Sequence, residues 1–336
     1  MKAVGFTTSL PIEAADSFID FEIPVPEPTG HDLLVKIKAV SVNPVDFKIR
    51  QNSAKDKVLD APKIIGWDAS GIVEAVGNNV TLFKKGDEVY YAGDINKPGS
   101  NAAYQLIDER IVGKKPSLLS DAEAAAMPLT TLTAWEALYD RMRINESDKG
   151  KSVLIIGGAG GVGSIAIQIA KKIAGLQVIA TASRPETVEW CKQQGADIVV
   201  NHKDLVSEVR NAGFKYVDFI LDFVNTNTYW DAMVELIKPQ GHIASITGSA
   251  EPVALTKLKS KSVTFSWEFM YTRSTFETDD MIEQHHILNK AAALFDNGTL
   301  KTTLNKTFNG LSADNLKAAH RLQESGKAIG KTVIVF

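Results

Sequence analysis

Up to about residue 115, the chain alternates apolar and polar residues in short runs that are separated by turn residues. The run 32–42 (DLLVKIKAVSV) alternates with a period of two, and so does the run 69–77, which ends in a Gly-Asn-Asn turn. A third run, 84–93, begins as a turn and continues as a strand. Such alternation is typical of strands with one buried and one exposed face. It predicts a β-rich first domain.

The pattern changes between about residues 150 and 270, where aliphatic runs without alternation are separated by segments with helical spacing. Runs rich in β-branched residues indicate strands that are covered on both faces. A helix between each pair of such strands indicates a parallel doubly wound sheet of the Rossmann type, and hence an α/β fold. The expected strands are 152–157, 177–182, 197–201, 216–222, 242–247 and 262–267, and the expected helices are 163–174, 185–195, 203–213 and 227–241.

The last 60 or so residues mix both patterns. Two helical segments, 280–297 and 312–325, precede a final strand, KTVIVF, and we expect this tail to return to the first domain. Pro116 marks a boundary, after which Ser120 or Asp121 is expected to cap a helix. The expected domains are a substrate-binding catalytic domain at 1–120, a dinucleotide-binding domain at 121–270, and a C-terminal return at 271–336 that completes the first.

The composition is that of a soluble globular protein of about two domains, with 336 residues, 44% of them hydrophobic and 23% charged. A net charge of −3 provides no basic field for nucleic acid or an anionic membrane surface. There is no run of about 18 apolar residues, and the acidic start argues against a signal peptide. The single cysteine, Cys191, allows no intramolecular disulfide and favours a reducing compartment such as the cytoplasm.

A glycine motif follows the first expected Rossmann strand. It reads Gly158-x-Gly160-x-x-Gly163 and stands between a strand and a helix, which is the context required for dinucleotide binding. Gly158 permits a tight turn, Gly160 allows the backbone to approach a pyrophosphate, and Gly163 allows close packing of helix on strand. Together with Gly161 and Val162 of the same turn, these residues are predicted to bind the cofactor. The alternative is a turn that serves packing alone.

The end of the next strand predicts which dinucleotide is bound. NAD sites place Asp or Glu there to bind the ribose hydroxyls, but this chain has Ser183 and Arg184 instead. A guanidinium attracts a 2′-phosphate, which a carboxylate would repel. We therefore predict NADPH as the cofactor, with His202 also on the cofactor side. The alternative is that Arg184 is a solvated loop residue.

Five motifs occur in an order that resembles the medium-chain dehydrogenase/reductase superfamily: NPVD, GWDASG, KKGDEV, PLTTLTAWEAL and GGAGGVG. Two more, YYAGD at 90–94 and WEFMYTR at 267–273, resemble its branch of zinc-type alcohol dehydrogenase-like proteins, which is related to NADPH:quinone oxidoreductases. The resemblance covers essentially the whole chain. It implies that the first domain is GroES-like and that the second is a Rossmann domain.

The same resemblance raises the question of a metal. Zinc members carry ligands where this chain has Asn43, Trp67-Asp68 and a residue near Leu129, and they carry a four-cysteine loop that is missing here. Zinc requires three or four ligands from Cys, His and carboxylates. We therefore predict no zinc site, and we expect Asp68 to form a structural salt bridge. One alternative is a zinc-dependent alcohol dehydrogenase with atypical ligands.

Without a Lewis acid, alcohol oxidation lacks support, whereas hydride delivery to quinones or α,β-unsaturated carbonyls remains feasible. The matching family positions suggest that the Asn43 amide binds the substrate oxygen, or else that Asn43 caps a helix, with Asp46 orienting that helix. Thr133 is placed near the nicotinamide, or else is a buried hydroxyl. Tyr91 and Tyr271 are candidate proton donors, or else packed aromatic residues.

The remaining cofactor contacts are expected where the last Rossmann strands end. Ile246 and Thr247 would offer backbone groups to the carboxamide, and Trp267 and Phe269 would flank the ring or pack in the core. The apolar segment 262–269 is predicted to join two copies edge to edge in a homodimer. A different alternative for the whole chain is a non-catalytic NADPH-binding sensor or structural protein.

Overall fold

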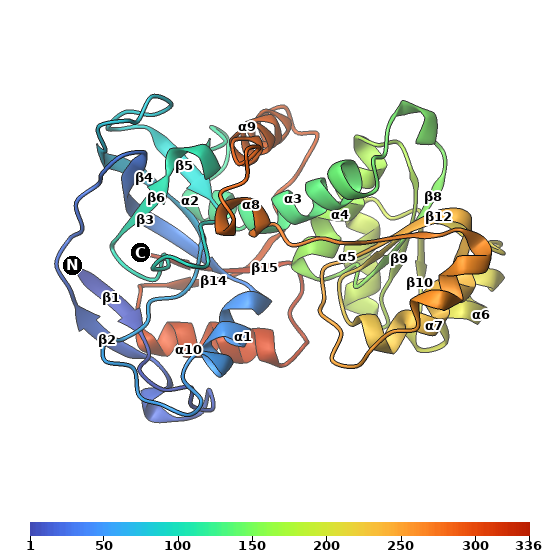
Figure 1. Cartoon of the computed structure of the whole chain (residues 1–336), viewed down its shortest axis with the longest axis horizontal. Coiled ribbons are helices and arrows are strands. Elements are labelled where there is room, and N and C mark those ends of the chain that lie inside the picture. The colour runs from blue at the N-terminus through green and yellow to red at the C-terminus, as the bar shows by residue number, and fades with distance from the viewer. The chain divides into compact units, whose positions relative to one another are not determined.

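The structure is a computed structural model that describes all residues from 1 to 336 (Figure 1). The chain forms two compact units. Unit 1 comprises Met1–Leu129 and Tyr271–Phe336, and unit 2 comprises Thr130–Met270. The chain first passes from unit 1 to unit 2 inside helix α3 (Pro128–Trp135). None of the helices is both long enough and apolar enough to cross a bilayer.

Unit 1 is built on a seven-stranded sheet in the order β14-β15-β3-β4-β5-β7, with β6 also paired to β3. A separate antiparallel pair, β1-β2, lies at the start of the chain. The strands of this unit are β1 (Lys2–Gly5), β2 (Ile19–Glu22), β3 (Asp32–Val42), β4 (Asp68–Val76), β5 (Glu88–Tyr91), β6 (Tyr104–Asp108), β7 (Val112–Lys114), β14 (Leu304–Asn309) and β15 (Lys331–Val335).

Strand β3 organises unit 1 because it is long enough to pair with three partners. Its first half pairs with β6, its last four residues pair with β15, and β4 runs antiparallel along most of its length. The C-terminal strand β15 therefore joins the sheet that β3 and its neighbours form. The helices of this unit are α1 (Pro44–Asn52), α2 (Asp121–Ala125), α8 (Thr272–Thr275), α9 (Glu283–Asp296) and α10 (Ala313–Glu324).

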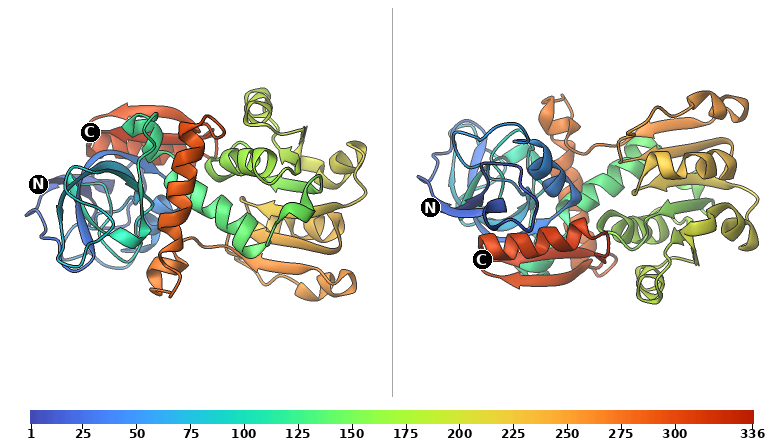
Figure 2. Two further views of the ribbon diagram at one scale, coloured as in Figure 1. Left: turned by 90° about the horizontal axis from the view of Figure 1, so that it is seen from above. Right: turned by 90° about the horizontal axis from the view of Figure 1, so that it is seen from below.

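Unit 2 is a six-stranded parallel sheet in the order β10-β9-β8-β11-β12-β13, with helices on both faces (Figure 2). Helix α4 packs on α5, and α6 packs on α7. The elements are β8 (Ser152–Ile156), α4 (Gly161–Lys172), β9 (Gln177–Thr181), α5 (Pro185–Gln194), β10 (Ile198–Val200), α6 (Leu205–Asn211), β11 (Val217–Asp222), α7 (Thr226–Leu236), β12 (Ile237–Ser245) and β13 (Thr264–Trp267).

The expected alternation of strands and helices is confirmed, and so is the α/β fold class. One boundary is wrong, because α7 ends at Leu236 rather than continuing to residue 241. Residues 237–241 already belong to β12, whose pairing with β11 shifts register where Gln240 adopts a positive φ of 61°. Turn-forming residues inside a bulged strand resemble the end of a helix in sequence. At α2, Ser120 rather than Asp121 is the cap, since its hydroxyl accepts from Glu123 N.

Candidate active site

The glycine turn lies between β8 and α4, as the spacing predicts. Gly160 is the N-cap of α4, and the first helical amide used within the helix is that of Ser164, which donates to Gly160 O at 2.9 Å. The amides of the preceding helical residues Gly161, Val162 and Gly163 therefore have no acceptor in the helix. Donors at a helix N-terminus form a binding site for phosphate.

The glycines differ in the space around their α-carbons. A Cβ on Gly163 would lie 2.1 Å from Gly157 O, and one on Gly158 would lie 3.0 Å from Cys191 Sγ. A Cβ on Gly160 would meet only Gly157 O, at 3.5 Å. Gly158 and Gly163 are thus required for packing, whereas Gly160 is exposed and leaves its backbone open to a ligand. Thr181, which sequence reasoning missed, holds the turn by accepting from Gly157 N at 2.9 Å.

Polar side chains meet beyond the ends of β9 and β10. Nε2 of His202 lies 3.1 Å from Ser183 Oγ, and its Nδ1 lies 3.2 Å from the hydroxyl of Tyr229 on α7. Arg184 follows Ser183 at the N-cap of α5 and pairs with Glu186 at 3.3 Å. The structure therefore brings Ser183 and His202 into contact, with Arg184 next in the chain. Tyr229 was not predicted, because nothing in the sequence marks it.

At the ends of β11 and β12, the carboxylate of Asp222 is fully buried and accepts from Val224 N at 3.0 Å and Thr226 Oγ1 at 3.1 Å. The hydroxyls of Ser245 and Thr247 also donate to it. This network orders the backbone around Thr247, whose amide donates to Ser245 Oγ and whose carbonyl lies 2.9 Å from Thr226 Oγ1, where it shares the hydroxyl proton with Asp222. The neighbouring Ile246 amide donates to Asp222 O.

Three further cofactor or catalytic candidates of unit 2 differ in exposure. Thr133 is buried on α3, whereas Trp267 and Phe269 are 49% and 45% exposed. The residue between the two aromatic side chains, Glu268, is buried and pairs with Arg141 at 2.7 Å. Both aromatic side chains, Trp267 at the end of β13 and Phe269 just beyond it, are therefore at the surface of unit 2, where they are available to a ligand or to another chain.

In unit 1, three buried side chains from three elements form a closed hydrogen-bonded cluster. The Lys331 ammonium donates to Asn43 Oδ1 and to Asp68 Oδ2, the latter at 3.0 Å. The Asn43 amide donates to Asp68 Oδ2 at 3.1 Å and to Ser41 O at 3.4 Å. The other Asp68 oxygen accepts from Leu129 N at 2.9 Å. We call Asn43, Asp68 and Lys331 the lysine cluster; the salt bridge expected of Asp68 is present.

Burial dominates the electrostatics of the lysine cluster and of the carboxyl group beside it. Burial raises the pKa of Asp68, while the Lys331 charge and hydrogen bonds from Leu129 and Asn43 oppose that rise. Burial raises the pKa of Asp46 to about 7, although its Oδ2 accepts from Asn43 N at 2.7 Å. Asn43 is the N-cap of α1, so the alternative expectation of a helix-capping position is confirmed. Asp46 binds this cap and orients the helix start.

The two candidate tyrosines of unit 1 are both buried. The Tyr91 hydroxyl donates to Gln105 Oε1 at 2.9 Å. The ring of Tyr271 packs edge-to-face on Trp67 at 6.3 Å between centroids. Burial, together with the charges of Asp46, Asp68 and Asp94, raises the pKa of Tyr271 well above its ordinary value. Tyr271 therefore keeps its proton across the neutral range and lies within the field of the lysine cluster.

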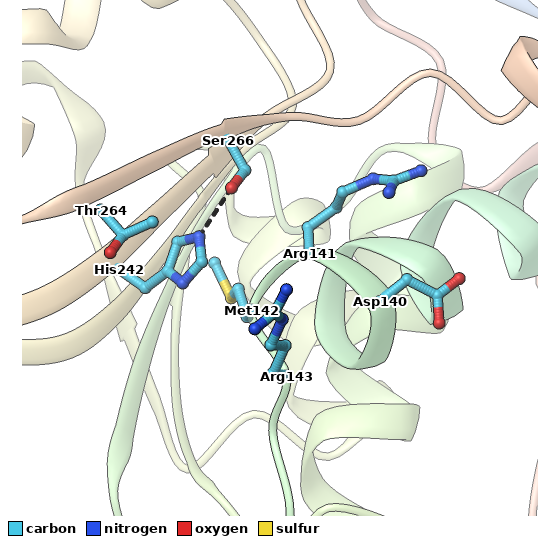
Figure 3. A pocket seen from close by; sticks show the side chains of 7 residues that line it. All are labelled: Asp140, Arg141, Met142, Arg143, His242, Thr264 and Ser266. Carbon is cyan, nitrogen blue, oxygen red and sulfur yellow. Dashed lines mark hydrogen bonds between the residues drawn. The ribbon is translucent and has the colours of Figure 1, made fainter.

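A surface pocket of about 450 Å³ lies elsewhere in unit 2 (Figure 3). It contains none of the predicted site residues, and its one internal hydrogen bond joins His242 Nε2 to Ser266 Oγ at 2.9 Å. Its lining residues are Asp140, Arg141, Met142, Arg143, His242, Thr264 and Ser266. The geometry of the cofactor and catalytic residues therefore argues against this pocket as the reaction site.

Comparison with known proteins agrees with both halves of this description. A family model described as a zinc-binding dehydrogenase matches residues 161–284, and one described as an alcohol dehydrogenase GroES-like domain matches residues 29–117. A zinc-type alcohol dehydrogenase-like protein of Staphylococcus aureus is 48% identical over 338 residues, which is 99% of each chain. The chain belongs to the medium-chain dehydrogenase/reductase superfamily. As expected, it lies in the quinone-oxidoreductase-like branch.

Further relatives of this superfamily extend the comparison. An NADPH-dependent alkenal/one oxidoreductase of Arabidopsis thaliana is 34% identical and matches 70% of this chain and 60% of that protein. The crystal structure of a putative zinc-dependent alcohol dehydrogenase from Rhizobium etli has a TM-score of 0.95 and 49% identity, covering 100% and 98% of the two chains. A quinone oxidoreductase from Coxiella burnetii has a TM-score of 0.83 and 26% identity, covering 100% and 99%. The chain is an oxidoreductase of this superfamily.

The residues of this superfamily member do not fit a catalytic zinc ion. At the positions that carry ligands in zinc members, only Asp68 offers a metal-binding side chain, and both its oxygens are already bonded. The ammonium of Lys331 beside it would repel a dication. No group of three or more His, Cys, Asp or Glu side chains is arranged to hold a metal ion.

Proposed function

We propose that this protein is an NADPH-dependent oxidoreductase that transfers hydride to quinones or α,β-unsaturated carbonyls without a metal ion. The observation that carries the proposal is the lysine cluster, in which an ammonium rather than a metal ion binds Asn43 and Asp68. In metal-dependent members, a Lewis acid polarises the oxygen of alcohols and simple aldehydes. Quinones and enones spread the developing charge onto an oxygen, so their reduction depends less on a Lewis acid.

Ser183, Arg184 and His202 support NADPH as the dinucleotide. They lie beyond β9 and β10, where NAD enzymes carry an acidic residue for the ribose. A guanidinium and a hydroxyl match a 2′-phosphate in charge and in hydrogen bonding. On binding, Arg184 would replace its partly exposed ion pair with Glu186 by an ion pair with the 2′-phosphate. The name of the Arabidopsis relative agrees with this preference.

When bound, NADPH supplies the hydride. The chain contributes binding and orientation: the amides of the glycine turn would hold the pyrophosphate, and the ordered backbone at Ile246 and Thr247 would receive the carboxamide. Trp267 and Phe269 would cover apolar surface of the ring. These residues fix the reacting geometry and exclude water, which is the protein's share of such a reaction.

The proton that completes the reduction is assigned to Tyr271. Its buried hydroxyl keeps its proton across the neutral range, so it is available as a donor to the developing oxyanion. Thr133 is proposed as a second hydroxyl facing the nicotinamide. Asn43 and Tyr91 are given supporting roles instead, because the Asn43 amide and the Tyr91 hydroxyl already donate within unit 1.

NADPH oxidation by the purified protein, measured against a panel of quinones, 2-alkenals and simple aldehydes with and without chelator, tests the proposal. We expect turnover of quinones or alkenals that chelator does not change. Turnover of simple aldehydes alone, abolished by chelator, would instead identify a zinc-dependent alcohol dehydrogenase. No turnover of any compound, with NADPH still bound, would identify a non-catalytic binding protein.

The cofactor assignment has its own test. Arg184→Ala is expected to weaken NADPH binding by roughly ten- to a hundredfold, as loss of a charge-assisted contact does, and to leave NADH binding unchanged. Lys192→Ala, which removes an exposed cation from the same helix α5, is the matched control. Nicotinamide fluorescence titration measures both affinities. An unchanged NADPH-to-NADH ratio in Arg184→Ala would remove Arg184 from the 2′-phosphate site.

We also propose that the protein acts as a homodimer in the cytoplasm. Strand β13 is an edge of the six-stranded sheet, and an exposed edge can pair with a second copy of itself. Half-exposed Trp267 at its end adds apolar surface. The only cysteine, Cys191, is buried and free, in agreement with a reducing compartment.

A further inference from the structure

The lysine cluster is assembled by the register of three strands of unit 1. Ser41 on β3 pairs with Asp68 on β4 and with Val333 on β15. Lys331 begins β15 and Asn43 follows β3, so their side chains meet at one end of the sheet. The backbone of Lys331 is itself fixed, since its amide donates to Thr303 O at 2.8 Å. The meeting of these three residues is therefore a product of the fold and not of a flexible side chain.

Every member of the cluster is withdrawn from solvent. Asn43, Asp68 and Lys331 are 2%, 0% and 1% exposed. Burying an ammonium and a carboxylate costs several kcal/mol each before their attraction is counted, and apolar residues of similar volume often give equal or greater stability. Stability alone therefore does not explain a buried lysine here. Its contacts point to a role in orientation.

Lys331 orients the Asn43 side chain by a single contact that nothing else in the chain replaces. The carbonyl oxygen of the Asn43 amide accepts from Lys331, which forces the NH₂ group toward Asp68 and Ser41 O. Asn43 is also the N-cap of α1, and Asp46 accepts from its backbone amide. Lys331 thus fixes the oxygen side of the Asn43 amide, while Asp68 and Ser41 fix its NH₂ side.

We propose that Lys331 is a positioning residue for the reductase reaction, whose ammonium serves as the buried cation of this site and locks Asn43 and Asp68 into one arrangement. The inference rests on the proposed function. It goes beyond that function because it gives Lys331, on the last strand, a role of its own: its ammonium holds Asn43 and Asp68 in place, as a metal ion would. Lys331 was not among the residues that the sequence singled out.

The test compares three variants with the wild-type protein in the reductase assay. Lys331→Met removes the cation, Lys331→Arg keeps a cation of different shape, and the double variant Lys331→Met/Asp68→Asn removes both charges. Lys327→Met, an exposed lysine of the same segment, is the control. For each protein, kcat and KM for the substrate, the dissociation constant of NADPH and the thermal midpoint are measured.

We expect Lys331→Met to lower kcat by about 10- to 100-fold, as loss of an orienting partner does, with unchanged NADPH affinity. Lys331→Arg should recover part of kcat. The double variant should recover the thermal midpoint, because no unpaired buried charge remains, but should not recover kcat. This split between stability and turnover is the result that a purely structural lysine would not produce.

Two results would overturn the inference while leaving the proposed function intact. If the double variant regained kcat together with its thermal midpoint, Lys331 would serve folding alone. If Lys331→Met raised the NADPH dissociation constant and left kcat unchanged, Lys331 would be a cofactor ligand. A wild-type protein that reduces nothing in the panel would instead remove the proposed function, and this inference with it, before any variant is made.

Discussion

At the scale of single residues, the glycines after β8 show how one motif combines two requirements. Spacing predicted Gly158, Gly160 and Gly163 correctly as the turn between strand and helix. What the spacing could not reveal is Thr181, whose hydroxyl accepts the Gly157 amide from the next strand. A threonine in an aliphatic strand carries no signal of its own, because its role depends on which strand lies beside it.

Gly163 and Gly160 should therefore respond differently to the same change. Gly163→Ala places a methyl 2.1 Å from Gly157 O and is expected to destabilise unit 2 by about 3 kcal/mol or more. Gly160→Ala is its matched control, since its methyl meets only one atom at 3.5 Å. We expect Gly160→Ala to fold normally but to bind NADPH about tenfold more weakly. Urea unfolding and fluorescence titration measure the two effects; a stable Gly163→Ala would contradict the packing argument.

At the scale of elements, alternating runs predicted β3, β4 and β5 of unit 1, with β3 correct to the residue, and aliphatic runs without alternation predicted the strands of unit 2. Strands β1, β2, β6, β7 and β14 were missed, since they are short or largely exposed and carry little pattern. The lysine cluster was missed for another reason. Lys331 and Asn43 are 288 residues apart, and only the register of β15 on β3 brings them together.

The burial of His320 on α10 predicts a pH effect. His320 on α10 is fully buried against Phe18, at 4.8 Å between ring centroids, and burial lowers its pKa from 6.5 to about 3. Between these values the unfolded chain binds a proton that the folded chain does not. The stability from a neutral His320 is therefore complete above pH 6.5 and is lost as the pH falls toward 3.

Replacing His320 should remove this dependence. When the pH falls from 7 to 4, the free energy of unfolding of the wild-type protein is expected to decrease by about 3 kcal/mol more than that of His320→Phe. His286→Gln, at a histidine that is mostly exposed, is the control and should follow the wild-type curve. Denaturant unfolding at a series of pH values provides the comparison. Parallel curves for His320→Phe and the wild-type protein would show that His320 does not titrate in this way.

At the scale of the whole molecule, the two units differ in how the chain builds them. Unit 2 is one continuous segment, whereas unit 1 combines the start of the chain with its last part. The sequence predicted a mixed C-terminal tail from its helical spacing, and the structure pairs its last strand with β3. Whether the exposed edge at β13 pairs with a second copy of the chain depends on two molecules, so the homodimer stays a prediction.

That prediction has a direct test in solution. Trp267→Lys places a charge at the end of the edge strand and is expected to convert a dimer into a monomer. Leu255→Lys, at another exposed apolar residue of unit 2, is the control and should remain dimeric. Sedimentation velocity at micromolar concentration distinguishes the two states. A wild-type protein that sediments as a monomer would exclude the edge-to-edge dimer.

The place of β15 in the chain also has a consequence during translation. Unit 2 can fold on the ribosome as soon as residue 270 has emerged, since all its strands precede that point. The sheet of unit 1 must wait for residues 331–335, and until then Asp68 lacks its ammonium partner and β3 has an open side. In a nascent chain stalled before Lys331, unit 2 would thus be folded while unit 1 would not. Chaperones would meet the chain in this form.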